Sequence, residues 1–141
     1  MFDRLLVTSL IAGSLGCMTA CGGSTPPTNE PTAIGTMTPD GVIVDPKDLK
    51  RIAGTTTIVP DENAREDLRA ANPSVPGIQA SFKVCIDPTG AVRKVVQLKS
   101  SGAPSYDDKI EHELHGWKFE PYQKDGAAAA ACSAYTIVFN F

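Results

Sequence analysis

The sequence predicts a two-layer α+β domain in which helices cover one face of a three-stranded, mixed sheet. Residues 80–87 and 134–141 alternate apolar and polar side chains with the period of a half-buried strand, and residues 91–98 are rich in valine. Between these strands, apolar residues recur at helical spacing from Tyr106 to Trp117. Because each alternating strand has one apolar face, a single layer of helices is enough to bury it. A chain of 141 residues has room for one such domain.

Charge and residue counts exclude several classes of function. The chain has 13 basic and 16 acidic residues, giving a net charge of −3, whereas a protein that binds nucleic acid needs a basic surface. Only two His and one Trp are present, which argues against a His-rich metal site and a large aromatic core. Four Cys are too few for a disulfide scaffold but enough for one lipid-attachment site and one disulfide. Because the net charge is negative, we expect no nucleic-acid partner.

An apolar leader opens the chain. Residues 5–20 are mostly apolar but fall short of the roughly 20 residues that a membrane-spanning helix needs, which favours a lipoprotein signal peptide over residues 1–20. The leader ends in Met18-Thr19-Ala20-Cys21, a pattern that resembles the lipobox of bacterial lipoproteins. We expect lipid on Cys21. Cys17 is a poorer candidate, and the alternatives are an ordinary cleaved signal or an uncleaved anchor.

Residues 21–50 have the composition of a linker. Gly, Ser, Thr and Pro dominate the segment, and five of the eleven prolines lie between Pro26 and Pro46. Few apolar side chains are available to offset the entropy of ordering it, so we expect a semi-extended tether. The short apolar run Gly41–Val44 is the exception, and our hypothesis for this run is that it packs on the domain that follows.

The predicted domain covers residues 51–141 and begins with an extended segment and a short helix. Asp61 is a natural N-cap, residues 62–71 are good helix formers, and Asn72-Pro73 ends the helix. A hairpin follows, because residues 80–87 and 91–98 are separated by Asp87-Pro88-Thr89-Gly90. In this turn the proline presets the backbone and the glycine ends it.

A second helix and a last strand complete the order helix, strand, strand, helix, strand. Ser105 is the expected N-cap of the helix, with Asp108 three residues later in a loose capping box. The apolar stripe of this helix consists of Tyr106, Ile110, Leu114 and Trp117. In the last strand, the odd-numbered residues from 135 to 141 form the apolar face.

Two cysteines bear on the strand order. The helical crossover makes the third strand parallel to the second, so we expect it beside the first, in the order 2-1-3. Cys85 and Cys132 then lie at the same end of neighbouring strands and both point away from the apolar face. A secreted chain meets an oxidising compartment, so we expect a Cys85–Cys132 disulfide. The alternative is a pair of free cysteines.

The order of motifs in residues 51–141 resembles that of a known family. The motifs are Ile58-Val59-Pro60, Phe82 to Val92, Ser100-Ser101-Gly102, Trp117 to Pro121, Asp125-Gly126 and Phe139-Asn140-Phe141. Their order and spacing are similar to those of the C-terminal domain of TonB-family energy transducers. The cysteine pair is absent from typical members and indicates a lipoprotein sub-branch.

The resemblance implies a periplasmic module that binds a protein partner. In this family the last strand is a sheet edge that can pair with a peptide strand from an outer-membrane transporter. The corresponding edge here consists of Tyr135, Thr136, Ile137, Val138, Phe139, Asn140 and Phe141. This segment contains no Lys, no Pro and no charge, so either Val42–Val44 covers it or it stays open for a partner. A purely structural edge strand is the alternative interpretation.

The short leader bears on the mechanism. An energy transducer of this family couples to a proton-driven motor through an inner-membrane helix, and the leader is too short to be one. We therefore expect a lipid-anchored module that faces the periplasm. Gly22 after Cys21 favours the outer membrane, by resemblance to lipoprotein sorting patterns. Two alternatives stay open: a structural envelope lipoprotein that uses the fold as a scaffold, and a transducer with an uncleaved leader.

No set of residues supports catalysis or metal binding. His112 and His115 lie beside Glu111 and Glu113, but a metal site needs a third ligand and none is evident. Ser100-Ser101-Gly102 lacks the strand and helix context of a nucleophile elbow, and the sequence has no Gly-rich phosphate loop. We therefore expect a protein that is not an enzyme and holds no cofactor.

Overall fold

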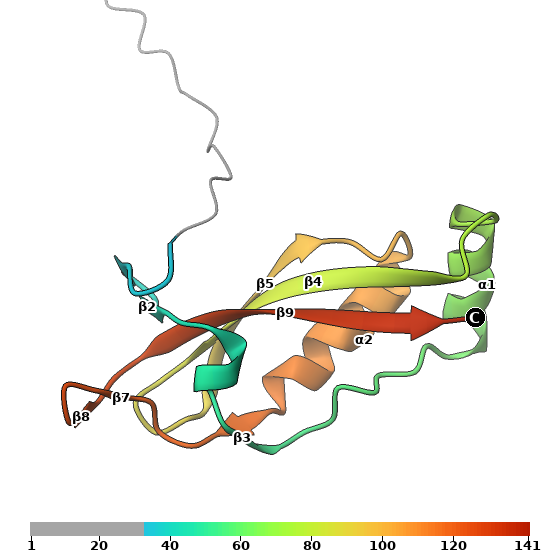
Figure 1. Ribbon diagram of the computed structural model, residues 1–141. Helices are drawn as coiled ribbons and strands as arrows, with labels where there is room; N and C mark the ends of the chain where they lie inside the picture. Colours follow the sequence, from blue (N-terminus) through green and yellow to red (C-terminus); the bar gives the residue numbers. More distant parts are fainter. Residues whose placement is uncertain (1–32) are drawn as a thin grey trace, which may run out of the picture. The chain divides into compact units, whose positions relative to one another are not determined.

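The structure is a computed structural model, and it describes residues 33–141 (Figure 1). The leader 1–20 and Cys21 lie outside the described residues. The helices are η1 (Pro46–Asp48, a 3-10 turn), α1 (Glu62–Ala71) and α2 (Pro104–His115). The strands are β1 (Met37–Thr38), β2 (Gly41–Ile43), β3 (Arg51–Ala53), β4 (Gly77–Ile86), β5 (Val92–Lys99), β6 (Lys118–Phe119), β7 (Gln123–Lys124), β8 (Ala127–Ala128) and β9 (Ala131–Asn140).

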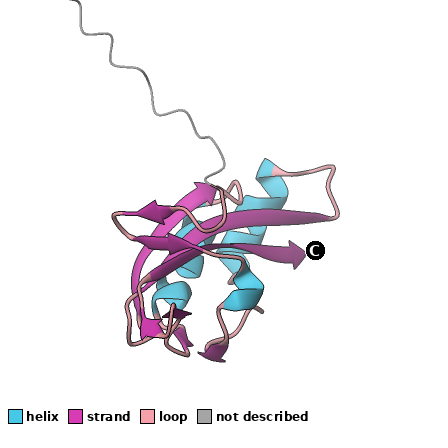
Figure 2. Ribbon diagram, turned by 60° about the vertical axis from the view of Figure 1, so that its left-hand side comes forward, coloured by secondary structure: helices cyan, strands magenta, loops and turns pink. Residues whose placement is uncertain are grey.

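The main sheet confirms the α+β class and the predicted strand order, but it has more strands than expected. Its order is β1-β2-β9-β4-β5. The strands predicted as first, second and third are β4, β5 and β9, and β4 lies between the other two, as expected. The helices α1 and α2 cover one face of the sheet (Figures 1 and 2). The prediction of three strands in the sheet was too low, because β1 and β2 extend the sheet beyond β9. Strands of two and three residues are too short to show a period in the sequence.

The β4–β9 ladder carries the core. Ten antiparallel pairs join Gly77–Ile86 to Ala131–Asn140 without a break in register. Phe82, Val84 and Ile86 of β4 and Ile137 of β9 are at most 1% exposed and face the helical layer. Tyr106, Ile110, Leu114 and Trp117 meet them from the other side and are buried to the same degree. The predicted stripe and the predicted strand faces are therefore the two halves of one core.

The start of α1 agrees with the prediction and the start of α2 does not. Asp61 caps α1, since its carboxylate accepts a hydrogen bond from the Ala64 N–H at 2.9 Å. Helix α2 begins at Pro104 after Ala103, not after Ser105, because proline suits the first helical position. Asp107 takes over the polar contacts there and accepts from the Ser101 N–H at 2.9 Å.

Part of the predicted linker 21–50 is ordered. Residues 37–48 form β1, β2 and η1, and Val42 and Val44 are 2% and 5% exposed. The Val42 N–H donates to the Ala130 carbonyl at 3.0 Å, and the Val44 N–H donates to the Cys132 carbonyl at 2.9 Å. The apolar run therefore packs on the domain as hypothesised, and ordered structure begins before residue 51. In residues 33–141, no helix combines the length and apolar character needed to cross a membrane.

Candidate functional site

Strand β9 is paired along its whole length on one side and only at its beginning on the other. On the first side it pairs with β4 from Ala131 to Asn140. On the second side β2 pairs with Ala131 and Cys132 in parallel orientation. Figure 1 shows β2 turning into η1 while β9 continues toward the C-terminus. No strand of residues 33–141 pairs with residues 134–140 on this second side. We call these seven residues the open edge.

The backbone alternation of β9 identifies the groups that face outward from the open edge. The carbonyls of Ala130 and Cys132 accept from β2, and the N–H of Phe141 donates to Pro76 on the β4 side. Within a strand the N–H and C=O of one residue point to the same side, and this side alternates. The N–H and C=O groups of four even-numbered residues therefore point outward, namely those of Ala134, Thr136, Val138 and Asn140.

The outer edge of β5 and the open edge of β9 differ in the residues that discourage pairing with a further strand. Strand β5, at one end of the sheet, carries Arg93, Lys94 and Lys99, and such charges discourage the pairing of further strands. The open edge of β9 has no Lys, Pro or charged residue. Val138 is 55% exposed, and Phe141, just beyond the strand, is 41% exposed. The open edge therefore lacks the charges that discourage strand pairing at β5.

Aromatic rings support the open edge from the helical side. Tyr135 packs edge-on against Trp117 with ring centroids 5.3 Å apart, and Phe139 packs on Tyr106 at 6.2 Å. Phe139 also contacts Phe141, at 5.7 Å. Burial raises the pKa of Tyr135 to about 12, against a smaller opposing effect of Arg51, so this side chain is neutral at physiological pH. The backbone of the open edge thus rests on a packed layer of aromatic rings.

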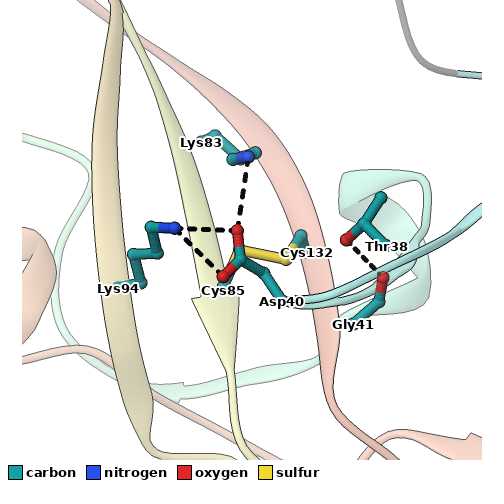
Figure 3. A network of polar contacts seen from close by, with 7 residues as sticks. All are labelled: Thr38, Asp40, Gly41, Lys83, Cys85, Lys94 and Cys132. Carbon is teal, nitrogen blue, oxygen red and sulfur yellow. Dashed lines mark hydrogen bonds and ion pairs between the residues drawn. A yellow bond between two sulfur atoms is a disulfide. The ribbon is translucent and has the colours of Figure 1, made fainter.

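A fixed hairpin closes the N-terminal end of the open edge. Asp40, in the turn between β1 and β2, accepts hydrogen bonds from Lys94 at 2.9 and 3.0 Å and lies 3.8 Å from Lys83 (Figure 3). The hydrogen bond from Lys94 is the main reason why the pKa of Asp40 is below its ordinary value. Gly41 has φ +138°, and a Cβ there would lie 2.7 Å from the Ala130 backbone. Only glycine therefore allows β2 to approach β9 so closely.

The predicted disulfide is present beside this hairpin. Cys85 and Cys132 are directly opposite each other in the β4–β9 ladder, and their sulfur atoms are bonded. Figure 3 shows the bond next to Asp40 and the two lysines. Both cysteines are nearly inaccessible, at 2% and 0% exposure. The alternative of two free cysteines does not hold in this structure.

The other predicted site residues lie where the sequence placed them or outside the described part. Tyr135 to Asn140 form the second half of β9, and Phe141 follows directly. His115 of α2 lies 3.9 Å from Glu111, and residues 33–141 contain no group of three or more potential metal ligands. Sequence reasoning missed Asp40 and its lysines, because residues more than 40 positions apart give no local signal.

The comparisons with known proteins found similarity to solved structures. No family model matches the sequence, and no curated protein matches it. The fold is similar to the solution NMR structure of the TonB CTD of Pseudomonas aeruginosa, with a TM-score of 0.47 and 17% sequence identity. The match covers 72% of this chain and 94% of that one.

Removing the disulfide should destabilise the domain. The bond joins residues 47 positions apart, and loop closure of this length contributes about 4 kcal/mol in the chain-entropy model. We expect the double variant Cys85→Ala/Cys132→Ala to lose stability on this scale in urea denaturation. Wild-type protein measured with a reductant is the control and should approach the variant. A double variant as stable as the oxidised wild type would contradict the expectation.

The ion pairs of Asp40 should make stability depend on pH in a defined direction. Because the folded-state pKa of Asp40 is below 3.8, its contribution is present above that value and is lost as the pH falls through the lowered pKa. Asp40→Asn should therefore be less stable than wild type at neutral pH, and the difference should vanish once the pH is well below the lowered pKa of Asp40. Asp48→Asn, in η1, is the matched control. A difference that stays constant with pH would exclude the ion pairs as its cause.

Proposed function

We propose that this domain binds a protein partner in the cell envelope by adding a strand of the partner to the open edge of β9. The observation that carries the proposal is the set of outward backbone groups at Ala134, Thr136, Val138 and Asn140. Main-chain hydrogen bonds to such an edge supply affinity, and side-chain contacts on alternate positions supply specificity. The sequence resemblance to TonB C-terminal domains supports the same mode of binding and favours a peptide of an outer-membrane transporter as partner.

The geometry of the edge limits the length of the partner strand. Seven residues are free, from Ala134 to Asn140, which is the length of an ordinary strand. At the N-terminal end the site is closed, since the Ser133 hydroxyl donates to the Val44 carbonyl at 2.8 Å and β2 occupies the preceding positions. A partner strand of about six or seven residues is therefore the segment that this edge accommodates.

We further propose that the module is held at a membrane by lipid on Cys21 and faces the periplasm. The motivation is the short apolar leader followed by Thr19-Ala20-Cys21, and Gly22 favours the outer membrane. Residues 22–32 would then lie between the lipid and the domain. The proposal makes the protein a tethered binding module and assigns it no catalytic step.

A proline in the open edge should weaken partner binding without unfolding the domain. Thr136→Pro removes an N–H that points away from β4, so the β4–β9 hydrogen bonds remain. With one backbone hydrogen bond lost and the approach of a strand hindered, we expect binding to weaken about tenfold or more. The measurement is a pull-down of envelope partners by the full chain, after circular dichroism has confirmed the fold.

Thr136→Ala is the matched control for the proline variant. It removes the hydroxyl, which contacts Ser81 at 3.0 Å, but keeps the backbone N–H. It should therefore capture partners as the wild type does. Equal capture by wild type and by folded Thr136→Pro would show that the edge is not the recognition site.

The lipid proposal has its own test. Cys21→Ala removes the thiol that would carry the lipid, so the variant should accumulate as a precursor and leave the detergent phase on partitioning. Cys17→Ala is the control, because it leaves the favoured lipobox intact. Mass spectrometry of the membrane fraction should find the lipid mass on wild type and on this control. Unchanged partitioning of Cys21→Ala would refute the proposal.

A further inference from the structure

Three arginine side chains line the helical side of the open edge. The guanidinium carbon of Arg51 lies 4.3 Å from the centroid of the Trp117 ring, and Trp117 packs on Tyr135 of β9. In α1, Arg65 lies 5.8 Å from the Phe139 ring and Arg69 lies 5.9 Å from the Phe141 ring. The inward-facing aromatic residues of β9 and its C-terminal end thus each have an arginine close by, directly or through Trp117.

These arginines are poorly satisfied by the rest of the chain. Within residues 33–141, neither Arg51 nor Arg69 has a carboxylate within 4.0 Å. Arg65 has one distant partner, Glu62 at 3.7 Å, whose side chain is 85% exposed. The Nε of Arg65 is buried and has no hydrogen-bond acceptor. Two arginines without a carboxylate partner in residues 33–141, beside a third with one distant partner, leave a place for external anions in a chain of net charge −3.

An added strand would bring its side chains to this row. Residues directly opposite each other on neighbouring strands have Cβ atoms about 4.5–5.5 Å apart and project to the same face. A partner residue opposite Phe139 therefore projects toward the helical layer, where Arg65 lies over the same ring. A residue opposite Tyr135 projects in the same way toward Trp117 and Arg51. Carboxylates at these alternate positions can accept paired hydrogen bonds from a guanidinium.

We propose that the partner strand is an acidic peptide, whose Asp or Glu side chains at alternate positions are recognised by Arg51, Arg65 and Arg69. This inference rests on the proposed addition of a strand to the open edge. The edge itself carries no charge, so the arginines supply the selectivity that its backbone groups lack. The same cations disfavour a basic segment, because it would place like charges side by side. Arginine is suited to this role, since its planar fork both stacks on aromatic rings and pairs with carboxylates.

The test uses an array of synthetic heptapeptides with β-forming residues at every second position and Glu, Gln or Lys at the others. The detergent-extracted full chain is the binding protein. Wild type should bind the Glu peptides about tenfold or more tightly than the Gln peptides, with the Lys peptides weakest. Arg65→Gln/Arg69→Gln should lose most of this preference for Glu, keeping only the part that Arg51 supplies, and should keep its binding to the Gln peptides.

Two further variants separate charge from geometry and from general basicity. Arg65→Lys/Arg69→Lys keeps the charges without the planar fork, so its preference for Glu should be intermediate. Arg93→Gln removes an arginine from β5, at the other end of the sheet, and should retain the full preference. If Arg93→Gln reduced the preference as much as the double Gln variant, overall charge would explain the result and the inference would be overturned.

Thr136→Pro distinguishes failure of this inference from failure of the proposed function. If peptides bind, binding is lost in Thr136→Pro, and wild type binds Glu and Gln peptides equally, then strand addition stands and acidic recognition is wrong. If no peptide binds in a manner sensitive to Thr136→Pro, both the strand addition and the inference built on it fail. A preference for Glu that depends on both Thr136→Pro and the two arginines supports the inference.

Discussion

The antiparallel ladder between β4 and β9 is the constraint on which the rest of the structure depends. Its ten pairs run without a bulge, so every inward residue of both strands meets the helices and every second residue of β9 turns its backbone outward. A slip of β9 by one residue would move Ile137 from the core to water and turn Cys132 inward, away from Cys85. The Cys85–Cys132 bond prevents that slip at the end where β2 also joins.

The open edge exists because the chain leaves β9 early. Strand β2 pairs with two residues of β9 and then turns away at Asp45-Pro46, where proline offers no N–H for further pairing. The Ser133 hydroxyl satisfies the last carbonyl of this segment, at Val44, so the departure leaves no unpaired group there. From Ala134 onward the outward groups of β9 are without a strand partner in residues 33–141. Along β9, the two residues that pair with β2 are thus followed by the open edge.

In the proposed complex, backbone groups and side chains have separate roles in recognition. The uncharged β9 offers the same hydrogen bonds to any extended peptide, which by itself gives affinity without selectivity. The arginines belong to β3 and α1, which lie on the helical side of β9. In the proposed complex their charges would act at alternate positions of the added strand, where side chains differ between peptides. The proposed acidic preference is therefore a property of the packing of three elements and not of the edge alone.

The sequence by itself determined the elements with a clear period or a strong local signal. The inward faces of β4 and β9 follow from alternation, and the α2 stripe follows from helical spacing. The Asp61 cap follows from the residue type before the helix. The disulfide was expected because Cys85 and Cys132 lie on the same face at the same end of neighbouring strands. The sequence did not show where β1 and β2 lie, since two- and three-residue strands carry no period, and it placed the N-cap of α2 two residues late, at Ser105 instead of Ala103. Tertiary structure alone decided that Asp40 binds Lys94 and that the pairing of β2 with β9 ends at Cys132. It also decided that Arg51 and Arg65 lie along the same edge of the sheet. These contacts join residues far apart in the chain, and their geometry depends on the complete packing of the layers, which no local pattern records.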